Sequence, residues 1–152
     1  MNAITTIEIT GVDHQDRFRS QLINRVAAIE AWAVQRLIGA GVDAKKAQLL
    51  SQRMDELRKC VKAHPSKFRN PDRVLKLLDD LVPFLTLRSV LAHSTASTHR
   101  AADGTSFILF ETPCVDPALP WTFRTILRQE ELASVLMRVS NLANQLNQQA
   151  SA

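Results

Sequence analysis

Apolar residues recur at steps of three and four along much of this 152-residue chain, the spacing that places them on one face of an α-helix. Two series are especially regular, and each forms a single apolar stripe: Ala47, Leu50, Met54, Leu57 and Val61, and then Leu132, Val135, Val139, Leu142 and Leu146. Between Phe18 and Ile38, two stripes lie beside each other, which indicates burial of a wide helix face. The pattern predicts helices over about 13–40, 43–64, 71–93 and 128–148.

Capping and helix-breaking residues set these limits. Gly39 ends the first helix, and Asp43 is a suitable N-cap for the second. Asn70 followed by Pro71 is a favourable N-cap and first-turn pair for the third helix. Residues 1–13 contain the β-prone patch ITTIEIT, so we expect a polar lead-in there rather than helix.

The segment between the third and fourth helices has a different pattern. Asp103-Gly104 is a strong tight-turn signal, and the sequences SFILFETP and WTFRTIL have the composition or alternation of strands. We therefore expect a hairpin or a small three-stranded sheet over about 98–127. The fold class that follows is all-α, an antiparallel four-helix bundle with a small β-hairpin insert, in one domain over residues 1–152.

The third helix loses its polar face after Asp80, where the sequence continues LVPFLTLRSVLAHS. A helix that is apolar on all sides has to be covered on all sides. Neighbouring helices of the bundle or a second subunit would provide that cover.

Composition narrows the function classes. The formal net charge of +4 favours an anionic partner such as nucleic acid, although ordinary solubility explains it equally well. Cys60 and Cys114 are isolated, so we expect reduced cysteines and neither a zinc site nor a disulfide framework. We see no signal peptide and no apolar stretch long enough to span a membrane, and we expect a cytoplasmic protein.

Arg88 and His93 stand out because they lie inside the apolar end of the third helix. Arg88 falls within about 20° of Leu77 and Leu81 around the helix axis, so it has a core-facing phase. A buried guanidinium needs an anion, a carbonyl group or water as a partner. Considered alone, Arg88 is interpreted as a structural ion pair with a carboxylate of another helix, for which we name three candidates: Glu30, Asp55 and Glu131.

His93 considered alone is interpreted as a C-terminal cap, because an imidazolium interacts favourably with the last carbonyl groups of a helix. The five-residue step from Arg88 turns the chain through about 140° in a regular helix. The two side chains therefore share one pocket only if the helix ends near Ala92, or if a second chain supplies the other half of the site.

The stretch R-S-V-L-A-H-S, from Arg88 to Ser94, resembles the Arg-x4–6-His signature of HEPN domains. These are small α-helical bundles in which a long helix carries the motif at its C-terminal end. The resemblance covers most of the chain as an arrangement of helices and about seven residues as a motif.

This resemblance implies a metal-independent endoribonuclease that works as a homodimer through the motif-bearing helix. His93 would act as acid or base on the ribose 2′-hydroxyl group, and Arg88 would bind the scissile phosphate. Ser89 and Ser94 would be auxiliary residues. Ser89 occupies the position directly after the motif Arg, where Asn, Asp or His is common in the family. Some HEPN toxins carry a Tyr two positions after the motif His, which a nucleotidyltransferase partner modifies. This chain has Thr95 at that position, so control by Tyr modification is excluded.

Within this family, the protein would be the toxin of a toxin–antitoxin pair or a phage-defence effector, with a cognate antitoxin as a second partner. Many HEPN-like proteins resemble inactive modules. The alternative is therefore a non-catalytic helical interaction or scaffold protein, in which Arg88 forms the structural ion pair.

Basic residues elsewhere are candidates for RNA binding: Lys62, Lys67 and Arg69 around Phe68, and Arg100 on the expected hairpin. The simpler interpretation of the first group is a solvated linker with Phe68 packed on the bundle. Glycine-rich phosphate loops, zinc-protease motifs and serine-hydrolase motifs are absent from the sequence, so we expect no cofactor and no metal ion.

Overall fold

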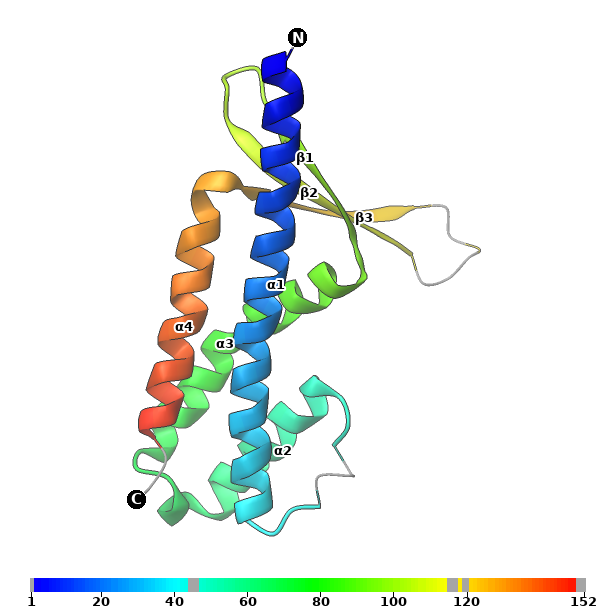
Figure 1. Cartoon of the computed structure of the whole chain (residues 1–152). Coiled ribbons are helices and arrows are strands. Elements are labelled where there is room, and N and C mark those ends of the chain that lie inside the picture. The colour runs from blue at the N-terminus through cyan, green and yellow to red at the C-terminus, as the bar shows by residue number, and fades with distance from the viewer. Residues whose placement is uncertain (1, 44–46, 115–117, 119–120, 150–152) are drawn as a thin grey trace. The chain divides into compact units, whose positions relative to one another are not determined.

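The computed structural model describes residues 2–43, 47–114, 118 and 121–149, and it combines long helices with a small sheet (Figure 1). In chain order, the helices, the strands and two short 3-10 helices (η) are α1 (Asn2–Gly39), α2 (Leu50–Ala63), η2 (Pro65–Lys67), α3 (Pro71–His93), β1 (Thr95–Arg100), β2 (Ser106–Pro113), β3 (Thr122–Arg128), η3 (Gln129–Glu131) and α4 (Leu132–Gln148).

The all-α prediction is wrong, because an antiparallel sheet with strand order β1-β2-β3 follows α3. The predicted hairpin insert accounts for only part of this sheet. A hairpin on its own is marginally stable in water, and a third strand gives the central strand a neighbour on each side. Here β2 is that central strand, and its Ile108 and Phe110 are fully buried.

The predicted bounds of α3 are confirmed at both ends. Asn70 caps the helix, since its Oδ1 accepts a hydrogen bond from the backbone N–H of Arg73 at 3.0 Å. Pro71 then occupies the first turn, where its missing N–H removes no helical hydrogen bond. At the other end, the helix includes His93 and strand β1 begins at Thr95.

Three other helix boundaries differ from the prediction. Helix α1 begins at Asn2, so the expected lead-in over residues 1–13 is helical from residue 2 onward. Helix α2 begins at Leu50 rather than at Asp43, with Gln52 Oε1 accepting a hydrogen bond from the Leu49 N–H; residues 44–46 of the predicted first turn lie outside the described residues. Helix α4 begins at Leu132, because Arg128 still belongs to β3 and Gln129–Glu131 form η3.

The chain divides into two compact units, each built from separate segments. We call them the sheet unit, which combines α1 up to Ile23 with Leu87–Met137, and the helical unit, which combines Asn24–Thr86 with the chain from Arg138 onward. Helices α1, α3 and α4 each contribute residues to both units.

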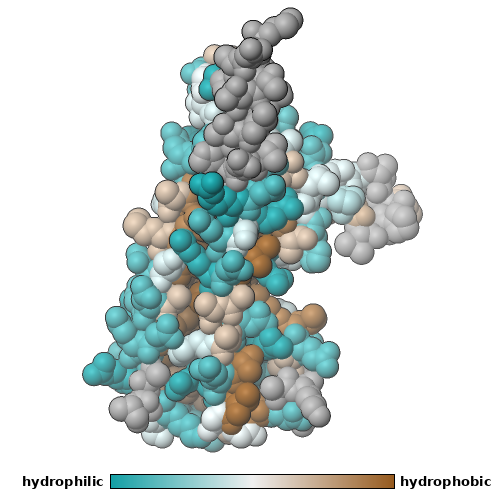
Figure 2. Space-filling model, viewed as in Figure 1, coloured by the Kyte–Doolittle hydropathy of each residue, from teal (hydrophilic) through white to brown (hydrophobic). Residues whose placement is uncertain are grey.

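The helical unit has a core of aliphatic side chains from four helices. The regular series predicted from the sequence provide much of it, since Met54 and Leu57 of α2 are buried together with Val139 and Leu142 of α4. Their burial removes apolar surface from water, which is the main favourable contribution to folding. On the viewed face in Figure 2, hydrophilic residues predominate and hydrophobic residues form small groups, as expected when the apolar stripes face inward.

In the sheet unit, one face of the sheet packs against α1. Gln15 of α1 is buried; its Nε2 donates to the carbonyl oxygen of Ala96 at 3.3 Å, and its Oε1 accepts from the Thr98 hydroxyl group at 3.1 Å. Ile108 and Phe110 lie on the same face, because they are the cross-strand neighbours of Thr98 and Ala96. These contacts fix strand β1, and with it the end of α3, against α1.

Candidate functional site

The two residues of the predicted catalytic pair, Arg88 and His93, lie in the last two turns of α3, within the sheet unit. His93 is the last residue of the helix and is exposed, and Arg88 is half-buried. A basic side chain in the last turn of a helix lies near the negative end of the helix dipole, and His93 has this position in α3.

The side chains of Arg88 and His93 have no hydrogen bond and no ion pair among the described residues. The three carboxylates considered as partners for Arg88 bind other groups. Glu30 pairs with Arg53, and the Glu131 side chain accepts a hydrogen bond from the backbone N–H of Arg128 at 3.1 Å.

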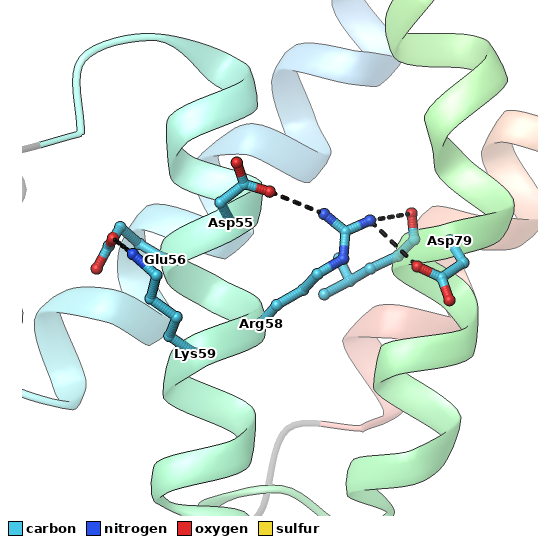
Figure 3. Close-up of polar contacts among 6 residues, drawn as sticks. Asp55, Glu56, Arg58, Lys59 and Asp79 are labelled. Atoms are coloured by element: carbon cyan, nitrogen blue, oxygen red, sulfur yellow. Dashed lines mark hydrogen bonds and ion pairs between the residues drawn. The ribbon is translucent and has the colours of Figure 1, made fainter.

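The third carboxylate, Asp55, lies 3.2 Å from Arg58 (Figure 3). The same guanidinium also contacts Asp79 of α3 at 3.2 Å and donates to the Leu78 carbonyl oxygen at 3.4 Å. Arg58, and not Arg88, is therefore the ion-pair partner of Asp55. The expected ion pair of Arg88 with Glu30, Asp55 or Glu131 is absent from the described residues.

The directions of Arg88 and His93 follow from the length of α3. The helix ends at His93, one residue after Ala92, and His93 is still part of it, so in a regular helix the five-residue step separates the two side chains by about 140° around the axis. A shared pocket within one chain was expected only for a helix that ends near Ala92. The second condition remains, in which another copy of the chain supplies the missing half of a site.

The two predicted auxiliary serines differ in their surroundings. Ser89 is exposed on α3. Ser94 is buried, with its hydroxyl group hydrogen-bonded to the Val90 carbonyl oxygen and to the hydroxyl group of Thr112. Ser94 thus ties the end of α3 to strand β2, which is a structural role.

Arg19 of α1 was not predicted, and it contacts the end of α3 directly. Its Nη2 donates to the carbonyl oxygen of Ser94 at 3.2 Å, and its guanidinium lies 5.9 Å from the centre of the Phe110 ring. Its Nε atom is buried without a hydrogen-bond partner among the described residues. Nothing in the local sequence around Arg19 signals these contacts, because the partners are distant in the chain.

The predicted RNA-binding residues are divided between the two units. Arg100 is exposed on β1 in the sheet unit, whereas Lys62, Lys67 and Arg69 belong to the helical unit. Lys67 Nζ donates to the Gly39 carbonyl oxygen at 3.1 Å, which satisfies the end of α1. Phe68 is buried, as the linker interpretation of this loop expects.

Candidates for other chemistry are few in the described part of the chain. Burial raises the pKa of the Cys60 thiol, with the nearby Lys67 acting in the opposite direction, so Cys60 is poorly suited to act as a nucleophile.

No group of three or more metal-ligating side chains lies together among the described residues. None of the described helices has both the length and the apolar character that crossing a membrane requires.

Comparison with known proteins gives no further assignment. The chain matches no protein-family model, no curated protein and no solved structure.

Proposed function

We propose that this protein is a metal-independent endoribonuclease of the HEPN type that acts as a homodimer. The observation that carries the proposal is the pair of cation-capable side chains, Arg88 and His93, at the end of α3. Neither has a partner among the described residues, and His93 is exposed. A half-buried guanidinium without a protein anion is suited to bind an anionic ligand.

RNA cleavage by these groups requires attack of the ribose 2′-oxygen on the adjacent phosphorus and departure of the 5′-oxygen. The 2′-hydroxyl proton passes to an imidazole, and the leaving oxygen takes up a proton from an acid. His93 has the side chain that exchanges protons near neutral pH. Arg88 offers two parallel N–H groups to the phosphate oxygens, where negative charge develops in the transition state.

A homodimer through α3 is the second part of the proposal. Between Asp80 and His93, the helix exposes residues that carry no charge: Val82, Pro83, Thr86, Ser89 and Ala92. This surface supports contact with a second copy, since uncharged residues lose little free energy when water is removed from them. In such a dimer, Arg88 of one copy and His93 of the other would form each site.

The alternative is a non-catalytic interaction module with Arg88 in a structural ion pair. It has less support, because the three acids considered for that role bind other groups. We also propose, from the resemblance alone, that the protein is a toxin or a phage-defence effector in the cytoplasm, held inactive by a cognate antitoxin. Lys62, Arg69 and Arg100 are exposed and would contribute to RNA affinity.

The experiment is RNA cleavage by the purified protein in the presence of a metal chelator. We expect wild-type protein to cleave a labelled single-stranded RNA and His93→Ala to lose at least about a hundredfold in rate, the usual contribution of a general acid or base. Arg88→Ala should lose activity to a similar degree, whereas Arg88→Lys should retain part of it because the positive charge remains.

His64→Ala is the matched control, because His64 is also an exposed histidine at the C-terminal end of a helix, where it directly follows α2. Its cleavage rate should equal that of wild type. Equal rates for His93→Ala and wild type would refute the proposal, as would cleavage that depends on added metal.

A further inference from the structure

The antiparallel register places nine residues on one face of the sheet in three rows across the strands. These rows are Thr95–Glu111–Arg124, Ser97–Leu109–Ile126 and His99–Phe107–Arg128. None of the nine is buried, in contrast to Ile108 and Phe110 on the opposite face. We call this surface the open face.

The middle and one end of the open face carry apolar and aromatic side chains beside Ser97 and Arg128. The ring of Phe107 stacks on the ring of His99, with the ring centres 5.5 Å apart and an angle of 19° between the planes. Next to them, Ile126 is 60% exposed. Flat rings and aliphatic side chains on a sheet surface are the features on which unpaired bases stack.

The charges on the strands favour an anionic ligand. Arg124 and Arg128 lie on the open face and Arg100 ends β1, whereas Glu111 is the only acidic residue in the three strands. Both arginines have an acidic neighbour, since Glu111 lies 3.7 Å from Arg124 and Glu130 lies 3.8 Å from Arg128. These ion pairs are exposed to water and therefore weak, so the guanidinium groups stay accessible to a phosphate. A strand of phosphates would find cations at both ends of the apolar surface.

A cavity of about 260 Å³ lies beside Phe107 and Ile126 and is also lined by Asp103, Arg128 and Glu130. The Thr105 N–H donates to Asp103 at 2.9 Å and lowers the pKa of that carboxyl group, so Asp103 is an acceptor at neutral pH. Carboxylates beside a stacking surface accept hydrogen bonds from the amino group of a base.

We propose that the open face binds a single-stranded segment of RNA, with an amino-bearing base such as adenine on Phe107 and phosphates on Arg124 and Arg128. The choice of RNA as the ligand rests on the proposed function. Strand β1 begins two residues after His93, and its residues Thr95 and His99 are separated by about 13 Å along the strand. RNA on this face would therefore run toward the end of α3 that carries His93.

The test is the affinity of the full-length protein for a fluorescently labelled oligoadenylate, measured by anisotropy. The oligoadenylate carries 2′-O-methyl groups, which remove the attacking hydroxyl, so it is not cleaved during the measurement whether or not His93 is catalytic. Phe107→Leu should weaken binding about tenfold, because it removes the stacking ring and keeps an apolar side chain. Ile126→Ala should weaken binding without affecting folding, because Ile126 is exposed.

Ile38→Ala is the matched control, since Ile38 of the helical unit is also 60% exposed, and its affinity should be unchanged. Arg124→Gln should reduce the slope of log affinity against log salt concentration by about one. Equal affinities of Phe107→Leu, Ile126→Ala and Ile38→Ala would overturn the proposal. It would also fail if Ile126→Ala changed the association state of the protein and left RNA affinity unchanged, because the face would then be a protein interface.

The binding result is independent of the cleavage result. If the face variants lose affinity while His93→Ala cleaves RNA as wild type does, the open face binds RNA and the proposed catalytic role of His93 is wrong. If His93→Ala abolishes cleavage and the face variants bind normally, His93 is required for catalysis and the proposal that the open face binds RNA is wrong.

Discussion

Individual arginines in this protein differ in what they contact. Arg53 pairs with Glu30 and also donates from Nε to the Ala47 carbonyl oxygen at 2.9 Å. Arg58 contacts two aspartates and a carbonyl group. Arg88 contacts no acid and no carbonyl group among the described residues, although it is half-buried. Because a desolvated cation without an anion costs free energy, a bound phosphate would improve the surroundings of the Arg88 guanidinium.

The first prediction concerns the stability of Arg88→Ala. We expect it to lower the free energy of unfolding by less than about 1 kcal/mol, since no ion pair or hydrogen bond is lost. Arg53→Ala should cost more, because it leaves Glu30 and a carbonyl group without their partner. Urea unfolding of the two variants and wild type measures both values.

A loss of about 3 kcal/mol or more in Arg88→Ala would be the cost of breaking a buried ion pair. That outcome would support the non-catalytic alternative. It would also require an acid that no described residue provides within the chain.

At the level of whole elements, α3 was predicted correctly because its signals are local. Asn70 and Pro71 start the helix through their own backbone and side-chain chemistry. The start of α2 was missed because Asp43 resembles an N-cap, whereas the helix begins later with a hydrogen bond from Leu49 to Gln52. The N-terminal part of α1 was missed because β-branched residues only weakly oppose helix formation.

The sheet and the site show the same division between local and distant signals. The third strand was recognised as a possibility from its alternation, but a hairpin was preferred because a strand pairing cannot be derived from one strand's own sequence. Arg88 and His93 were found through their spacing on one helix. Arg19 and Gln15 were not found, because their partners lie more than seventy residues away in the sequence.

The prediction at this scale concerns Gln15, which joins α1 to β1. Gln15→Ala should lower the free energy of unfolding by about 1–3 kcal/mol, because it removes the two hydrogen bonds that the buried Gln15 side chain makes with the half-buried Thr98 and Ala96. Gln21→Ala is the matched control, since Gln21 lies on the same helix and is exposed. Chemical denaturation that gave equal stabilities for the two variants would show that these hydrogen bonds do not hold the sheet.

For the molecule as a whole, the question is whether one chain contains a complete site. Helix α3 directs Arg88 and His93 about 140° apart, so one copy presents two separate halves. A two-fold dimer would bring Arg88 of one copy to His93 of the other and would form two equal sites. Catalysis would then depend on association, and activity per chain would fall on dilution below the dimer dissociation constant.

Mixing two inactive variants tests this arrangement directly. Arg88→Ala and His93→Ala should each be inactive alone. In a mixed dimer, however, the chain that keeps Arg88 and the chain that keeps His93 form one intact site. Random exchange of equal amounts should therefore restore about a quarter of the wild-type rate per chain, because half of the dimers are mixed and each has one good site of two.

If both residues of a site came from the same chain, every site in the mixture would lack one of them, and no activity would return. The double variant Arg88→Ala/His93→Ala, mixed with either single variant, is the control. It cannot complete a site in either arrangement, so any activity in that mixture would be contamination. Activity that returns in the mixture of the two single variants, and not in the mixtures with the double variant, would show that two copies of α3 form the catalytic centre together.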